Sequence, residues 1–177
     1  MGELVAAEKG ATIVNLSSRG YELAEVNLEG PNFKDGRLYH PWNAYGQSKI
    51  ANILFSRSLG KKLRNKGIAA FAVHPGLIME SQFFINAKVS QELLMEGFEM
   101  ARARNDGNPL PPRANATLTQ GAACVLVAAL DPSIREYSPA YMVENQIVKP
   151  KTYATNEANA EALWKLSEKL VGEKFDI

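Results

Sequence analysis

Cysteine and histidine are scarce in this sequence of 177 residues, which holds one cysteine, Cys124, and two histidines, His40 and His74. A single cysteine excludes an internal disulfide framework, and with two histidines it does not make a convincing metal site. Cys124 lies in the apolar run 122–130, which favours a buried, reduced thiol over a nucleophile or a metal ligand.

Long apolar runs and an excess of one charge are also absent. No segment has the length of a transmembrane helix and no signal peptide opens the chain, so we expect a soluble, cytoplasmic protein. The net charge is only +1 and the basic residues are scattered, which argues against nucleic acid or an anionic surface as a partner. No repeat, low-complexity tract or linker divides the chain, so we expect one domain over residues 1–177.

Two apolar segments frame an amphipathic helix near the start of the chain. Residues 11–16 and 68–73 are rich in Ala, Val and Ile and predict buried strands. Between them, one helical face carries apolar residues: Ile50, Ile53, Leu54 and Leu63. The order strand, helix, strand predicts an α/β fold.

The rest of the chain gives weaker signals. Residues 20–42 predict a long ordered loop over the site, with aromatic side chains at Tyr21, Phe33, Tyr39 and Trp42. Residues 81–112 predict one or two short helices with an apolar face, ending in a proline-rich break at 108–112. We then expect a helix over 119–130, a last strand over 141–148 that is bent or turned near 144–145, and a final helix capped by Asn156. That helix should turn four apolar residues inward: Ala162, Leu163, Leu166 and Leu170.

Tyr45 and Lys49 lie four residues apart, and so on the same face of the predicted helix. A tyrosine with an ordinary pKa near 10 is a poor proton shuttle, and a neighbouring cation lowers that pKa by favouring the phenolate. The pair is therefore a candidate acid–base catalyst, although an ordinary surface tyrosine and lysine have the same spacing. Ser17 and Ser18 end the first strand, where open α/β sheets place their ligands, and His74-Pro75-Gly76 ends the second.

Three segments in this order resemble the short-chain dehydrogenase/reductase family: I-V-N-L-S-S, A-Y-G-Q-S-K and V-H-P-G. The stretch A-Y-G-Q-S-K-I-A-N-I-L-F and the long segment 19–43 look like the subgroup of retinol dehydrogenases and WW-domain oxidoreductases. The resemblance implies a Rossmann-like, doubly wound parallel sheet. It also implies hydride transfer between a nicotinamide nucleotide, NADP in preference to NAD, and an alcohol or carbonyl compound.

The resemblance assigns roles to individual residues. Tyr45 would be the general acid/base, Lys49 would lower its pKa, and both would contact the nicotinamide ribose. Ser18, the second serine of the pair, would hydrogen-bond the substrate oxygen. Pro75, Gly76 and the Ile78 backbone would line the nicotinamide carboxamide, and Ser81 would replace the family's threonine with a shift of one residue.

The first half of the family pattern is missing from this sequence. None of the thirteen glycines forms the glycine-rich turn that cradles a pyrophosphate, and no Asn-Asn-Ala-Gly segment occurs. Residues 1–10 instead predict the tail of a helix ending at a glycine cap. We therefore expect a partial sheet of about three strands without the nucleotide-binding half. Its strand at 11–16 would form an exposed edge that favours a homo-oligomer, a partner chain or low solubility.

Three interpretations of function stay open. The chain is a partial oxidoreductase, a cofactor-independent isomerase, cyclase or dehydratase that uses the same acid–base residues, or a non-catalytic remnant that binds a partner. The apolar segment 81–112 suits a lipid-like, steroid-like or polycyclic substrate, as in secondary metabolism, although plain core packing explains it equally well.

Overall fold

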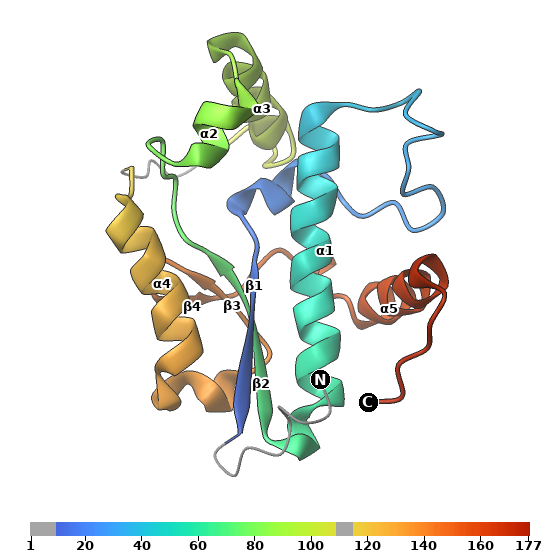
Figure 1. Ribbon diagram of the computed structural model, residues 1–177. Helices are drawn as coiled ribbons and strands as arrows, with labels where there is room; N and C mark the ends of the chain where they lie inside the picture. The colour runs from blue at the N-terminus through green and yellow to red at the C-terminus, as the bar shows by residue number, and fades with distance from the viewer. Residues whose placement is uncertain (1–9, 109–114) are drawn as a thin grey trace.

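A four-stranded sheet forms the centre of the computed structural model, which describes residues 10–108 and 115–177 (Figure 1). Strands β1 (Ala11–Leu16), β2 (Ile68–His74) and β3 (Ala140–Val143) are parallel neighbours, and β4 (Gln146–Val148) runs antiparallel to β3. All seven residues of β2 are buried, as expected for a central strand covered on both faces. The predicted α/β fold with a parallel, Rossmann-like core is confirmed.

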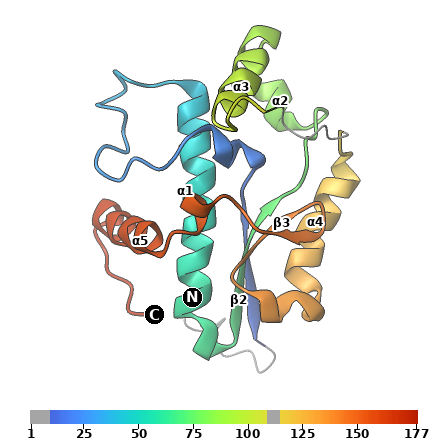
Figure 2. The same cartoon turned by 180° about the vertical axis from the view of Figure 1, so that it is seen from behind.

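Helices cover both faces of the sheet, as the views from the front and from behind show (Figures 1 and 2). Helix α1 (Pro41–Lys62) packs on one face, and the predicted apolar residues Ile50, Ile53 and Leu54 are buried there against Ala72 and Tyr141. Helix α4 (Leu118–Leu130) packs on the other face, where Cys124 and Ala128 meet a set from the sheet: Ala69, Phe71, Val73 and Met142. Alternate residues of β2 thus enter two different cores.

Helix α5 (Glu157–Val171) lies on the outer side of α1. Asn156 caps it, as predicted, by accepting a hydrogen bond from the Asn159 backbone. The prediction for Leu170 is wrong: this side chain in the last turn is 62% exposed, while Leu163 and Trp164 are buried. Trp164 stacks on Phe55 of α1, so the middle turns of α5 make its apolar contact with α1.

The last predicted strand is a hairpin of two strands. Glu144 and Asn145 both have left-handed backbone conformations, with φ of 50° and 68°, so of the predicted bend or turn the structure has a turn that reverses the chain. The sheet therefore has four strands rather than three, and β4 is exposed at all of its residues.

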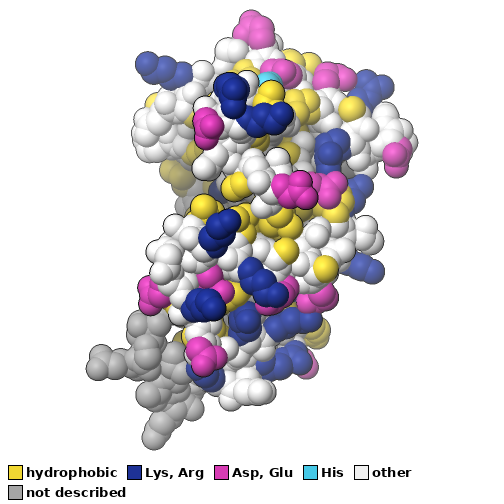
Figure 3. Space-filling view, turned by 90° about the vertical axis from the view of Figure 1, so that its right-hand side faces the viewer, with side chains coloured by type: hydrophobic (Ala, Val, Ile, Leu, Met, Phe, Trp, Pro, Cys, Tyr) yellow, Lys and Arg dark blue, Asp and Glu magenta, His cyan; other side chains and the backbone are white. Residues whose placement is uncertain are grey.

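Strand β1 lies at the other end of the strand order, so the predicted edge position is correct. Its residues Ala11 to Asn15 are half-buried, and Leu16 is 50% exposed. Among the helices of the described ranges, none is long and apolar enough to cross a membrane. Charges of both signs are interspersed over the face that α5 and the preceding loops present (Figure 3).

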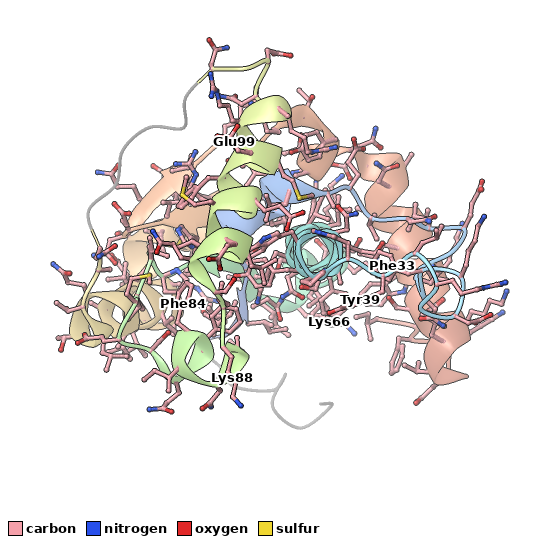
Figure 4. All side chains as sticks on the ribbon, turned by 90° about the horizontal axis from the view of Figure 1, so that it is seen from above. Phe33, Tyr39, Lys66, Phe84, Lys88 and Glu99 are labelled. Carbon is pink, nitrogen blue, oxygen red and sulfur yellow. The ribbon has the colours of Figure 1, made fainter. Side chains whose placement is uncertain are left out.

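Two short helices, α2 (Gln82–Ala87) and α3 (Gln91–Ala103), lie beyond the carboxyl ends of β1 and β2, in agreement with the predicted helices there. The loop before α1 begins with a short 3₁₀ helix, η2 (Arg19–Leu23). The outer part of this loop, with Phe33 and Tyr39, lies on the side of α1 opposite α2 (Figure 4). The prediction that the whole loop covers the site is therefore wrong for this part. The predicted helix tail at 1–9 and the proline-rich segment 109–112 fall outside the described residues.

Candidate active site

Two adjacent serines at the end of β1 have different partners. The Ser17 hydroxyl donates to the Lys49 backbone carbonyl at 2.8 Å, and the Ser17 amide donates to the Val73 carbonyl of β2 at 2.8 Å. The Ser18 hydroxyl accepts from the Gly20 amide at 3.0 Å, which caps η2, and it lies close enough to the Tyr45 phenol to lower the pKa of that phenol. Ser17 therefore ties β1 to its neighbours, while Ser18 faces the candidate acid–base residue.

The Tyr45 ring is enclosed by groups from three segments. Gly20 of η2 lies directly against the ring, where an added Cβ would collide with it. The rings of Phe83 and Trp42 lie 5.7 Å and 6.1 Å from that of Tyr45, measured between centroids. Burial raises the pKa of the Tyr45 phenol above its ordinary value, and the Ser18 hydroxyl lowers it in part.

Lys49 lies beside Tyr45 on α1. Its ammonium group is 5.5 Å from the centroid of the Tyr45 ring and donates to the Leu16 carbonyl at 3.4 Å. Burial lowers the pKa of Lys49. The net shift of the Tyr45 pKa is upward because burial is its largest cause, while the Lys49 ammonium group lies over the Tyr45 ring and hydrogen-bonds a backbone carbonyl.

Two asparagine side chains, one on β1 and one on α1, make further hydrogen bonds between these two elements. Neither of them was identified from the sequence. The Asn52 side chain donates to the Leu16 carbonyl at 2.7 Å, and the Asn15 side chain donates to the Ser56 hydroxyl at 2.9 Å. Asn52 lies three residues after Lys49 and so on the same helical face, which is the signal in the sequence that could have identified it.

The turn after β2 runs beside the end of β1, because the two strands are parallel neighbours. Gly76 has a φ of 102°, and an added Cβ there would lie 2.8 Å from that of Ala116. The side chain of Ile78 packs against Gly121 of α4, so only the backbone of this turn is available to a ligand in the predicted way. Ser81 precedes α2 and its amide donates to the Ile78 carbonyl at 3.0 Å, which places the turn and α2 in one compact segment.

Cys124 is fully buried on α4, as predicted for a structural thiol. The Asn145 amide donates to its sulfur at 3.3 Å, and burial raises the pKa of the thiol. Within residues 10–108 and 115–177, no three side chains of His, Cys, Asp or Glu lie close enough together to hold a metal ion.

Comparison with known proteins gives relatives over nearly the whole chain. No protein-family model matches it. Mouse retinol dehydrogenase 12 is 28% identical over 166 residues, covering 94% of this chain and 47% of the relative. The chloroplastic short-chain dehydrogenase TIC 32 A of Brassica napus is 32% identical over 164 residues, covering 90% of this chain and 46% of the relative. The human WW domain-containing oxidoreductase is 29% identical over 171 residues, covering 93% and 38%.

A solved structure is also similar. The crystal structure of an uncharacterized protein from Mycobacterium paratuberculosis superposes with a TM-score of 0.59 at 26% identity, over 95% of this chain and 53% of that one. This chain spans about half the length of the curated relatives that it matches.

Proposed function

From the premise that this chain is related to the short-chain dehydrogenases/reductases, we propose that Ser18, Tyr45 and Lys49 form the proton-transfer site of an oxidoreductase of that class. The observation that carries the proposal is the gathering of these three side chains: the Ser18 hydroxyl is close enough to the Tyr45 phenol to lower its pKa, and the Lys49 ammonium group lies 5.5 Å from the centroid of the Tyr45 ring. These three side chains lie where parallel strands end, which is the usual ligand position in open α/β sheets.

The residues present fit the nicotinamide end of a dinucleotide. An ammonium group and a phenol can hydrogen-bond ribose hydroxyls, and the backbone of Pro75, Gly76 and Ile78 can hydrogen-bond the carboxamide, with Ser81 as a further contact. When bound, NADP(H) would supply or accept the hydride. NADP is proposed over NAD from the subgroup that the sequence resembles. The sequence contains no glycine-rich turn for the pyrophosphate, so these residues account for one end of the cofactor.

The residues of the chain would carry out the proton transfer during reduction of a carbonyl compound. The Ser18 hydroxyl would turn from Tyr45 to the carbonyl oxygen and donate a hydrogen bond to it. The Tyr45 O–H bond would break and its proton would pass to that oxygen, which becomes the alcohol. A raised Tyr45 pKa keeps the phenol protonated at neutral pH and so favours this direction. The positive charge of Lys49 would stabilise the phenolate left behind.

Apolar side chains around Tyr45 support a hydrophobic substrate. Phe83 and Trp42 flank the phenol, and further apolar side chains on the same segment are exposed at Met79, Met95 and Phe98. A lipid-like, steroid-like or polycyclic alcohol or ketone would bury this surface.

A second candidate function needs no nucleotide. The serine, the tyrosine and the lysine suffice for proton transfer at a carbonyl, so an isomerase, cyclase or dehydratase activity uses only groups that the chain contains. The open edge of β1 also supports a proposed homo-oligomer or partner chain, whether or not the site is catalytic.

Nicotinamide binding and one substitution test these proposals. We expect calorimetry to show binding of NADPH, and Tyr45→Phe to lower turnover of an apolar ketone by at least about 100-fold, the lower limit for loss of a general acid. Tyr39→Phe is the matched control, because Tyr39 is 60% exposed on the loop away from the site. Turnover lost in Tyr45→Phe without any nucleotide binding would favour the cofactor-independent reaction. Unchanged turnover in Tyr45→Phe would contradict both catalytic proposals.

A further inference from the structure

Trp42 connects the candidate catalytic tyrosine to the segment that lies over it. It occupies the first turn of α1, three residues before Tyr45, so the two rings lie on neighbouring positions of one helical face. They meet edge to face, with an interplanar angle of 80°. On its other side the Trp42 indole contacts α3, a helix from a distant part of the sequence.

The contact between Trp42 and α3 is both polar and close. The indole N–H donates to the Leu93 carbonyl at 2.6 Å. The ring lies against Gly97, where an added Cβ would be 2.8 Å from an indole carbon. Gly97 is buried in a helix whose outward positions are exposed, and a glycine costs helix stability, so its place here is explained by the close approach of the indole. His40 and Glu96 add a 3.1 Å contact beside it.

The far end of α3 is fixed to the serine-bearing turn. Arg104, which ends the helix, donates to the Glu22 carbonyl of η2 at 2.8 Å and pairs with the Glu25 carboxylate at 3.3 Å. Its guanidinium group also lies 5.7 Å from the ring centroid of Tyr153. Helix α3 is therefore held at Trp42, beside Tyr45, and at η2, which begins after Ser18.

We infer that Trp42 is a positioning residue that seats α2 and α3 over Tyr45 and so sets how tightly an apolar substrate is held. The inference rests on the proposed function, since it concerns the substrate of that site. Residues 88–90 join α3 directly to α2, and Phe83 of α2 lies against the Tyr45 ring. A shift of α3 that α2 follows would therefore change the apolar wall of the site while leaving Ser18, Tyr45 and Lys49 in place.

Gly97→Ala tests the contact directly. The new methyl group pushes on the indole, while alanine strengthens the helix itself, so any displacement of α3 does not come from helix unfolding. The sequence has two tryptophans, so every variant and the reference protein also carry Trp164→Phe, which leaves Trp42 as the single tryptophan. We expect acrylamide to quench Trp42 fluorescence more strongly in Gly97→Ala. Glu99→Ala is the control, because Glu99 is an exposed residue of the same helix (Figure 4).

The functional consequence is measured with decanal as an apolar test substrate and NADPH as reductant. We expect KM to rise about fivefold or more in Gly97→Ala, the effect of an added methyl group in a packed site. Trp42→Phe keeps a ring but loses the indole hydrogen bond, and should raise KM by about fivefold. In Gly97→Ala kcat should stay within about twofold, since this substitution lies on α3 and leaves the proton-transfer groups unchanged.

The outcomes separate this inference from the proposed function. Unchanged quenching in Gly97→Ala would show that Trp42 does not hold α3. Increased quenching with unchanged KM, or an equal loss of kcat and kcat/KM, would overturn the positioning role. If the unaltered protein binds decanal without reducing it, the proposed reduction fails and the decanal Kd replaces KM as the measured quantity. A protein that does not bind decanal would contradict both proposals.

Discussion

Replacing Gly46 by alanine sets two effects of opposite sign against each other. Gly46 lies inside α1, directly after Tyr45, and alanine in a helix interior is favoured over glycine by about 1 kcal/mol. The structure adds a clash: the new Cβ would lie 2.6 Å from the Ala24 amide nitrogen, 3.0 Å from the Leu23 Cβ and 3.1 Å from the Ala24 Cβ. The nearest of these atoms belongs to the backbone, so the contact cannot be relieved by a side-chain rotation.

We therefore expect the clash to exceed the gain in helix propensity. Forcing a methyl group into a packed site costs about 1–3 kcal/mol, and the rigid contact places Gly46→Ala in the upper part of that range. After the propensity gain, the free energy of unfolding should fall by about 1–2 kcal/mol, and the melting temperature by about 2–8 °C for a chain of this size. Because Leu23 and Ala24 end the turn that begins at Ser18, the same change should also draw Ser18 away from Tyr45.

Thermal unfolding followed by circular dichroism provides the assay. Ser48→Ala is the matched control, since Ser48 is exposed on the same helix two residues later and should be neutral or stabilised by a few tenths of a kcal/mol. If Gly46→Ala melts higher than the unaltered protein, as propensity alone predicts, then α1 and η2 are not packed as described and the reasoning is wrong.

Two further predictions concern titration. The phenolate absorbance of Tyr45, measured as the difference between the unaltered protein and Tyr45→Phe, should develop at a pH above the ordinary tyrosine pKa. It should develop at still higher pH in Ser18→Ala, because this substitution removes the contact that lowers the Tyr45 pKa. A midpoint at or below the ordinary value would contradict the burial of the phenol. The hydrogen bond from Lys61, with Arg57 beside it, holds the pKa of Glu157 below its usual range, so this group stabilises the fold above its unfolded pKa and the effect is lost as pH falls through the folded one. Glu157→Gln should therefore lower stability to urea by no more than about 1 kcal/mol at neutral pH, because the pair is exposed, and by nothing in acid; a difference that persists in acid would rule out the ion pairs as its source.

The strand–helix–strand unit could be predicted because the apolar residues of its helix recur with the helical period between two apolar, β-branched segments. Ile50, Ile53 and Leu54 share a face and are all buried. The hairpin at Glu144 could not be predicted in the same way. Asn145 tolerates a left-handed conformation, but glutamate adopts it rarely, so the sequence indicated a bend or a turn without deciding between them, and the structure has a turn.

The candidate site also has one part that could be predicted from the sequence and one part that could not. The family resemblance alone favoured Ser18 over Ser17, and in the structure Ser18 is the serine that lies beside Tyr45. The protonation of Tyr45 was not predictable, because it depends on burial by Phe83 and Trp42 and on where the Lys49 ammonium group points. Those contacts join segments that are far apart in the sequence.

The contacts between the end of β1 and α1 tolerate a change in the number of residues in this helix less well than a change in its composition. Four successive residues at the end of the strand meet four positions of the helix in reverse order: Asn15 with Ser56, Leu16 with Asn52, Ser17 with Lys49, and Ser18 with Tyr45. One step along the strand corresponds to about one turn of the helix. A single inserted residue between Tyr45 and Ser56 would rotate the phenol by about 100° relative to the other contacts. Substitutions on the outer face of α1 leave this correspondence intact, whereas one insertion or deletion breaks it at every later position.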